Sequence, residues 1–131
     1  MLAVSQQLGI QSELIPRIAT AFGGGIGGRG EVCGAVIGSV MSIGLKYGRE
    51  EPSQPHLETY ALAREFCRRF DEETGSLSCR ELTGMDLSTP EGVQAFQSSD
   101  VPLRVCLPAI GAAFRLVTEL LGRPAPPAAD D

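Results

Sequence analysis

A run of glycines that leads directly into an apolar segment constrains this chain more than any other feature. Six of the eight residues from 23 to 30 are glycine. Glycine loses more conformational freedom on folding than any other residue, so such a run marks backbone that needs a positive φ angle or close approach to another group. In the apolar segment that ends near Leu45, a small residue recurs at every fourth position, namely Gly34, Gly38 and Ser42. These positions share one face of a helix, which predicts that another backbone packs closely against that face.

The spacing of apolar residues elsewhere predicts an all-α fold. Apolar side chains recur at three- and four-residue intervals, and no stretch alternates as a half-buried strand does. We predict a small single-domain helical bundle of about five to six helices with a glycine-rich loop. The expected helices cover residues 2–8, 13–21, 31–45, 56–73 and 104–122, with shorter helical turns at 79–83 and from 88 onward. We assign residues 1–122 to this domain and expect residues 123–131, a tail rich in Pro and Ala, to be disordered.

Composition argues against several classes of function. The net charge is −5 and no basic cluster extends beyond Arg68 and Arg69, so we expect no nucleic-acid partner. The apolar stretch from residue 32 to residue 45 is shorter than the ~20 residues that a membrane helix needs, which predicts no membrane association. The N-terminus lacks the basic and apolar regions of a secretory signal. Four cysteines without such a signal indicate a cytoplasmic protein, because persistent disulfides are rare in that compartment.

The four cysteines are the main candidates for chemistry, and their positions in the predicted helices say more than their spacing. No two are separated by only two residues, so the usual signal of thioredoxin-like and zinc-ribbon sites is missing. All but the second fall at predicted helix starts, and arginines lie nearby in sequence; the cysteines are Cys33, Cys67, Cys79 and Cys106, and the arginines are Arg29, Arg68, Arg80 and Arg104. Both features lower the pKa of a thiol, which makes the cysteines candidate nucleophiles, redox partners or metal ligands. The alternative is that free cysteine packs as a small apolar residue.

The glycine loop is a weaker candidate site. Gly23-x-Gly25-x-x-Gly28 matches a dinucleotide-binding fingerprint in form. It follows an amphipathic helix instead of a strand, so we reject dinucleotide binding. The loop could still present backbone N–H groups to an anion or a cluster, which makes Gly24, Gly25, Gly27 and Gly28 candidate cofactor-binding residues. The equal alternative is a tight connection between two helices.

Six short motifs, spread over about residues 8–121, carry a family resemblance. They are Phe22-Gly-Gly-Gly-x-Gly, Glu31-Val-Cys-Gly-Ala-x-x-Gly38, Gly44-Leu-Lys-Tyr-Gly48, Phe66-Cys67, Ser78-Cys79-Arg-Glu-Leu-Thr-Gly84 and the late Cys106. Together they resemble a family of redox-active proteins named for its C_GCAxxG_C_C cysteine pattern. The resemblance implies a small helical protein of bacteria or archaea that performs redox or metal chemistry through its cysteines. Related domains occur beside haem or iron–sulfur electron carriers.

The resemblance also assigns the cysteines by position. Cys33 matches the cysteine after the glycine loop, Cys79 and Cys106 match the two later ones, and Cys67 matches an additional cysteine common in the long helix. Many members carry a further cysteine or selenocysteine upstream, in a first helix. We therefore expect the native reading frame to begin before Met1.

The leading interpretation is a cysteine-based redox protein that works by thiol–disulfide exchange or electron transfer through clustered cysteines. The same four cysteines would alternatively hold zinc or an iron–sulfur cluster, for which four thiolates suffice. A third interpretation is a helical interaction module with structural cysteines. In the first two, we expect the cysteines to converge at one end of the bundle near the glycine loop, Cys33 with Cys79 or Cys106 first. The expected partner is a redox protein, and the sequence leaves a homodimer open.

Overall fold

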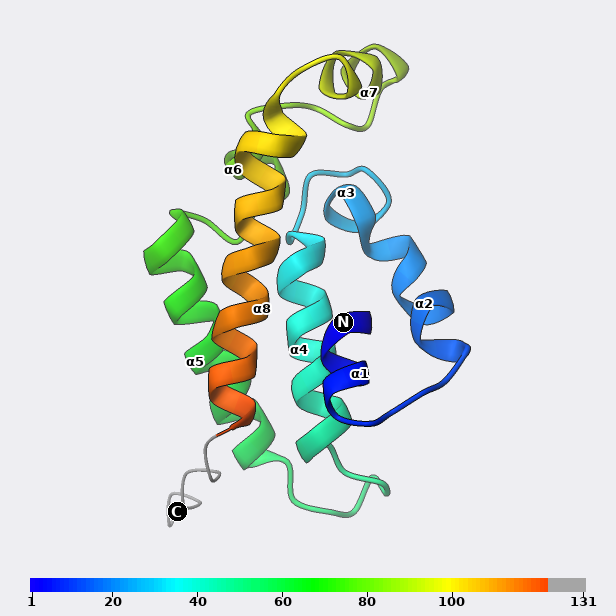
Figure 1. The fold of residues 1–131 in the computed structure, drawn as a ribbon, viewed down its shortest axis with the longest axis vertical. Helices are drawn as coiled ribbons and strands as arrows, with labels where there is room; N and C mark the ends of the chain where they lie inside the picture. The colour runs from blue at the N-terminus through cyan, green and yellow to red at the C-terminus, as the bar shows by residue number, and fades with distance from the viewer. Residues whose placement is uncertain (123–131) are drawn as a thin grey trace.

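The computed structural model describes residues 1–122 and has the predicted all-α architecture (Figure 1). The elements are α1 (Leu2–Gln7), α2 (Leu14–Ala19), the 3₁₀ turn η1 (Thr20–Phe22), α3 (Gly23–Ile26), α4 (Gly34–Tyr47), α5 (Leu57–Thr74), α6 (Cys79–Thr83), α7 (Pro90–Gln97), the π-helical turn η2 (Pro102–Cys106) and α8 (Leu107–Leu121). Within these residues the only β-type pairing is an isolated antiparallel bridge between Val32 and Ser78. The predicted disordered tail lies outside the described residues.

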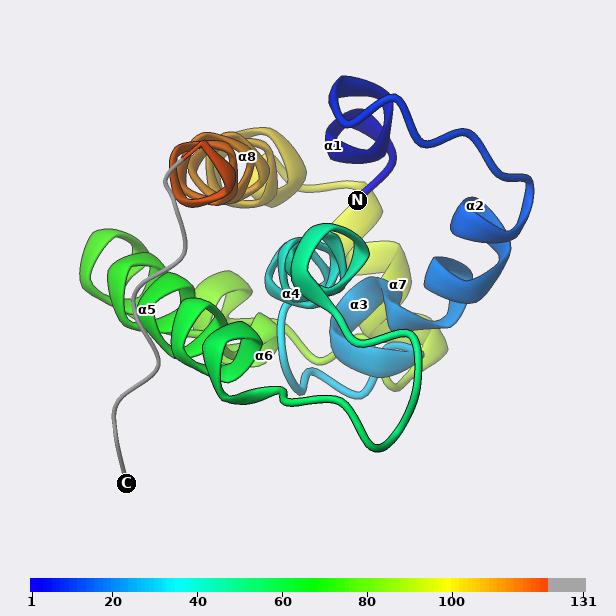
Figure 2. The ribbon, with the colours of Figure 1, turned by 90° about the horizontal axis from the view of Figure 1, so that it is seen from below.

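Three helices form the centre of the bundle, because α4, α5 and α8 each pack against the other two (Figure 2). Their apolar faces meet in one cluster whose fully buried large side chains are Ile43, Phe66, Phe70 and Val117. Burying a side chain of this size contributes about 1.5–3 kcal/mol. The short helix α1 lies over α4 beside α8, while α2 and α3 lie on the side of α4 away from α5 and α8 (Figure 2). The helices α6 and α7 lie toward the end of the bundle where α8 begins (Figure 1).

The start of the last helix differs from the prediction and has a local cause. The first residues of the helix predicted over 104–122 belong to the π turn η2, in which the N–H of Leu107 donates to the carbonyl of Pro102. Pro108 has no N–H group, so it cannot donate to the carbonyl of Arg104 as a regular helix residue would. A single π turn accommodates this loss, and such turns are frequent at functional sites. Regular α8 then begins at Leu107.

The start of α4 also differs from the prediction. The helix begins at Gly34, and Cys33 is the N-cap residue with an extended backbone (φ −55°, ψ 133°). Cys33 is held in this conformation because its N–H donates to the carbonyl of Leu77 at 2.7 Å. The small face of α4 is covered as predicted, since a Cβ on Gly34 would lie 3.1 Å from the carbonyl oxygen of Phe22.

The glycine loop forms one turn of left-handed helix. Gly24, Gly25, Ile26 and Gly27 have φ angles of 63°, 70°, 65° and 60° in succession. A left-handed turn costs about 1–2 kcal/mol for each L-residue that carries a Cβ, whereas glycine enters it freely. The turn therefore explains why the segment is glycine-rich, and the predicted positive φ angles are confirmed. Ile26 is the exception, as the only residue other than glycine with positive φ in residues 1–122.

Replacing Ile26 by glycine is expected to raise the melting temperature by a few degrees. The Ile26 side chain is 40% exposed, so little packing is lost, while the strain of a β-branched residue at positive φ is removed. The net gain is about 0.5–1 kcal/mol, because the greater entropy of glycine in the unfolded chain offsets part of the relief. Thermal denaturation measures it, with Ile26→Asn as an intermediate case since asparagine tolerates this conformation. A lower melting temperature for Ile26→Gly would show that the side chain stabilises the loop.

By length and composition, no single helix of residues 1–122 could span a membrane. The pair formed by Pro90–Gln97 and Pro102–Leu121 reaches the required length and apolar character only when taken together, across a bend of 73°.

Candidate functional site

The isolated bridge brings two cysteines onto one face of a short antiparallel pairing. The segments 30–33 and 77–80 run past each other around Val32 and Ser78. The N–H of Cys33 donates to the carbonyl of Leu77, and the N–H of Cys79 donates to the carbonyl of Glu31, both at 2.7 Å. Cys33 and Cys79 each follow the bridge residue of their own segment. Because side chains alternate along extended backbone, both thiols project from the face opposite the Val32 and Ser78 side chains.

Cys106 joins these two thiols from the end of the π turn. The turn η2 packs against α6, whose first residue is Cys79, and α6 also packs against α3. The charge on Cys33 raises the pKa of both Cys79 and Cys106, and the charge on Cys106 raises the pKa of Cys79. The bridge between segments 30–33 and 77–80 and the packing of η2 on α6 bring the three cysteines into neighbouring segments, and their mutual effects on pKa agree with this placement. We call Cys33, Cys79 and Cys106 the thiol trio.

Cys67 does not belong to this group. It lies in the middle of α5 and packs against the hydrophobic core. Its pKa is raised by burial alone, without a contribution from the thiol trio. Of the four candidate site residues, the structure therefore brings three together and leaves Cys67 apart.

The expected lowering of the thiol pKa values is wrong for three of the four cysteines. Burial is the largest cause that raises the pKa of Cys67, Cys79 and Cys106. Desolvation disfavours the charged thiolate, so the neutral thiol is preferred.

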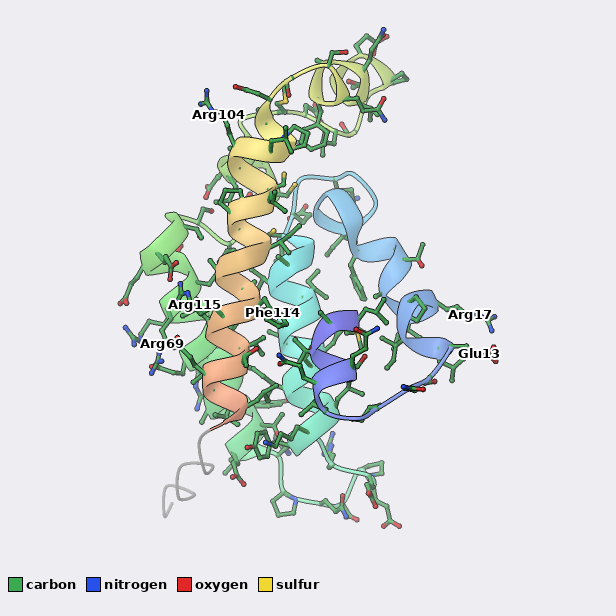
Figure 3. All side chains as sticks on the ribbon, viewed as in Figure 1. Glu13, Arg17, Arg69, Arg104, Phe114 and Arg115 are labelled. Carbon is green, nitrogen blue, oxygen red and sulfur yellow. The ribbon has the colours of Figure 1, made fainter. Side chains whose placement is uncertain are left out.

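The arginines near the cysteines do not offset this burial, because carboxylates hold their guanidinium groups. These ion pairs join Arg29 to Glu31 at 3.7 Å, Arg68 to Glu65 at 3.0 Å, Arg80 to Asp86 at 3.0 Å and Arg104 to Asp100 at 3.1 Å. Figure 3 shows Arg104 pointing outward from η2, just before α8. An arginine that is close to a cysteine in sequence thus pairs with a carboxylate and not with the thiol.

The glycine loop supports the thiol trio by packing and leaves few donors for an anion. A Cβ on Gly25 would lie 2.7 Å from the Cβ of Cys79 and 2.6 Å from the backbone nitrogen of Glu31. The N–H groups of Gly27, Gly28 and Glu31 donate to carbonyls of residues 21, 23 and 25. This geometry favours a tight connection over the cofactor-binding role considered for Gly24, Gly25, Gly27 and Gly28.

The cysteines do not fit a metal centre in this arrangement. In the part of the chain that the structure describes, no group of three or more His, Cys, Asp or Glu side chains is placed so that it could hold a metal ion. A tetrahedral thiolate site needs four sulfurs at about 2.3 Å from one point, whereas Cys67 lies apart from the other three, in the middle of α5. We therefore derive no step through zinc or an iron–sulfur cluster.

A pocket of about 470 Å³ lies between the end of α5, α6 and the η2–α8 junction. Its lining includes Leu82 and Val105, which are close in sequence to Cys79 and Cys106, but none of the cysteines lines it. The candidate site is therefore the thiol trio itself and not this pocket.

Comparison with known proteins identifies the family. Residues 1–120 match the family described as "Putative redox-active protein (C_GCAxxG_C_C)". An uncharacterized protein of Archaeoglobus fulgidus is 30% identical, in a match that covers 68% of this chain and 66% of that protein, so the chain spans just under two thirds of this relative's length. No solved structure matches the chain significantly. The family match covers nearly the whole chain, which therefore belongs to the C_GCAxxG_C_C family of redox-active proteins.

Proposed function

We propose that this protein carries out thiol–disulfide exchange with a redox partner through the thiol trio. The observation that carries the proposal is the bridge that joins the segments of Cys33 and Cys79, with the η2 turn of Cys106 packed against α6. Exchange needs two thiols within reach of each other, one to attack and one to resolve. The described cysteines are all free, which suits a reducing compartment such as the cytoplasm.

The exposure of each thiol suggests which cysteine attacks the partner and which one resolves the mixed disulfide. Cys79 is only 8% exposed, whereas Cys33 and Cys106 are half-buried and more accessible to a partner. A half-buried thiolate attacks one sulfur of the partner's disulfide, and the other partner sulfur leaves as a thiolate that takes up a proton. The Cys79 thiolate then attacks the protein sulfur of the mixed disulfide and releases the partner's second thiol. Two electrons pass to the partner, and the protein keeps an internal disulfide.

The bridge holds Cys33 and Cys79 just beyond the distance of a disulfide. Cys33 lies opposite Leu77, so Cys79 is its diagonal neighbour on the same face. Diagonal neighbours are about 7–8 Å apart, whereas a disulfide joins Cα atoms about 5.5–6 Å apart. Oxidation of this pair therefore requires the two segments to close by about one or two ångströms.

Mild oxidation by a small-molecule disulfide is expected to form one intramolecular disulfide within the thiol trio and to leave Cys67 free. The oxidised chain is alkylated, digested and mapped by mass spectrometry, with thiols counted before and after addition of a chelator. Cys67→Ser serves as the matched control and should oxidise as the wild type does, whereas Cys79→Ser should accumulate mixed disulfides. A disulfide that includes Cys67, or thiols that become reactive only after chelation, would contradict the proposal.

A further inference from the structure

An exposed apolar face borders Cys106 at the beginning of α8. Leu103, Leu107 and Ile110 are 71%, 58% and 54% exposed, which is unusual for three large apolar residues on one short stretch. Leu107 follows Cys106 directly, and Ile110 lies one helical turn further on the same side as Cys106. Farther along α8 the corresponding stripe is buried, at Ala113 and Val117. The core-facing stripe of α8 thus emerges into solvent beside the thiol.

Gly111 adds a second observation on this face. It lies one turn after Leu107, inside α8, and apart from its neighbours along the helix no described atom comes within 4 Å of the position that its Cβ would take. Glycine inside a helix is less favourable than alanine, and no contact within this chain offsets that cost. Without a side chain, this position lets another polypeptide backbone approach α8 closely, as small residues do at helix contacts.

The charges around the thiol trio indicate which kind of disulfide this face suits. A pocket of about 270 Å³ lies beside the bridge, and its lining includes Arg29 and Arg80. Both arginines are already paired with carboxylates, and so is Arg104. The chain as a whole carries a net charge of −5. A small anionic disulfide such as oxidised glutathione would meet no unpaired cation among these residues, and it would be repelled by the net charge.

We propose that Leu103, Leu107, Ile110 and Gly111 form a docking face for a protein partner whose disulfide is flanked by apolar residues, and that this face delivers the disulfide to Cys106. The inference rests on the exchange function proposed above. The Cys106 thiolate attacks the near sulfur of the docked disulfide, whose far sulfur leaves and takes up a proton. The Cys79 thiolate then attacks the Cys106 sulfur, which forms the Cys79–Cys106 disulfide and releases the partner as a dithiol.

The test compares three probes on the full chain. They are a peptide disulfide with leucines flanking each cysteine, the same peptide with aspartates in place of the leucines, and oxidised glutathione. The reduced wild type is expected to reduce the leucine peptide at least tenfold faster than either other probe. Leu107→Asp and Ile110→Asp should remove this preference. Val93→Asp, which places the same charge on an exposed apolar position of α7, should keep it. Melting curves confirm that each variant is folded.

The outcomes separate this inference from the function on which it rests. Equal rates with all three probes, unchanged in Leu107→Asp, would overturn the docking face and leave thiol–disulfide exchange standing. No reaction with any probe would overturn both. Size-exclusion chromatography adds a further outcome: a wild-type dimer that Leu107→Asp converts to a monomer would show that the face joins two copies of this chain, and it would overturn the docking proposal. Gly111→Leu is a check that adds no charge. It should block the close approach of a partner and slow the reduction of the leucine peptide alone.

Discussion

Replacing Gly25 by alanine is expected to destabilise the protein by about 2–5 kcal/mol. The backbone there has a φ angle of 70°, which costs about 1–2 kcal/mol for a residue with a Cβ. The new methyl group would also stand 2.7 Å from the Cβ of Cys79 and 2.8 Å from the carbonyl oxygen of Glu31, so the bridge segments must shift. Overpacking of this kind costs about 1–3 kcal/mol more. The free energy of unfolding, measured by urea denaturation, gives the effect directly.

Gly27→Ala is the matched control for this substitution. Gly27 has a similar φ angle of 60°, but its Cβ would meet no atom within 4 Å. Gly27→Ala should therefore lose only the stability that the strained backbone costs, about 1–2 kcal/mol. Gly25→Ala should also change the alkylation rate of Cys79, whereas Gly27→Ala should not. Equal losses of stability in the two variants would mean that Gly25 is kept for its φ angle alone and does not support the thiol.

The alkylation rates of Cys79 and Cys106 are expected to rise about 100-fold between pH 7 and pH 9 and to keep rising above it. Only the thiolate reacts, and below its pKa the thiolate fraction of a thiol grows tenfold for each pH unit. Burial and the neighbouring thiols raise the pKa of both cysteines, so neither should reach a plateau where an ordinary thiol does. Site-specific mass spectrometry after timed iodoacetamide treatment gives both rates, with the urea-unfolded chain as the control that levels off near pH 9. A plateau below pH 8 would show a lowered pKa instead.

The raised pKa values of Cys79 and Cys106 also make the stability of the fold depend on pH. The folded protein prefers the neutral form of Cys79 and Cys106, whose pKa values are higher in the fold than in the unfolded chain. This contribution to stability is complete below the unfolded pKa and is lost as the pH rises through the folded pKa. Alkaline conditions that activate the thiols therefore also weaken the fold that holds them.

Periodicity predicted the helices because it reports which face of a segment is buried. The amphipathic pattern placed α5 within one residue at each end, since the N-cap position of His56 and the C-terminal Gly75 are both local signals. The left-handed turn was also readable, because glycine is the residue that adopts positive φ angles without a steric cost. The π turn was missed although Pro102 and Pro108 bracket its position in the sequence. One proline fits a helix start, and only the missing N–H of the second produces the bulge.

The site was less predictable than the fold, because it depends on contacts that leave no periodic signal. An isolated bridge such as Val32–Ser78 is too short to produce the alternation that marks a strand. The sequence suggested Cys33, Cys79 and Cys106 by their helix starts, and the structure places them together, while their chemical roles stay predictions. The effect of nearby arginines cannot be read from the sequence, because a guanidinium pairs with the carboxylate that its long side chain can reach, as Arg80 does with Asp86. Such choices are settled only in three dimensions.

The bridge between Val32 and Ser78 also sets when the site can exist during folding. It closes a segment of chain that contains all of α4 and α5. Closing so long a segment has an entropic cost that the unfolded chain cannot meet by local contacts, so the two helices must pack against each other first. We therefore expect the cysteines on either side of the bridge to meet late, after the central helices have docked. A chain still emerging in extended form keeps Cys33 and Cys79 apart, and this order protects it from premature cross-linking.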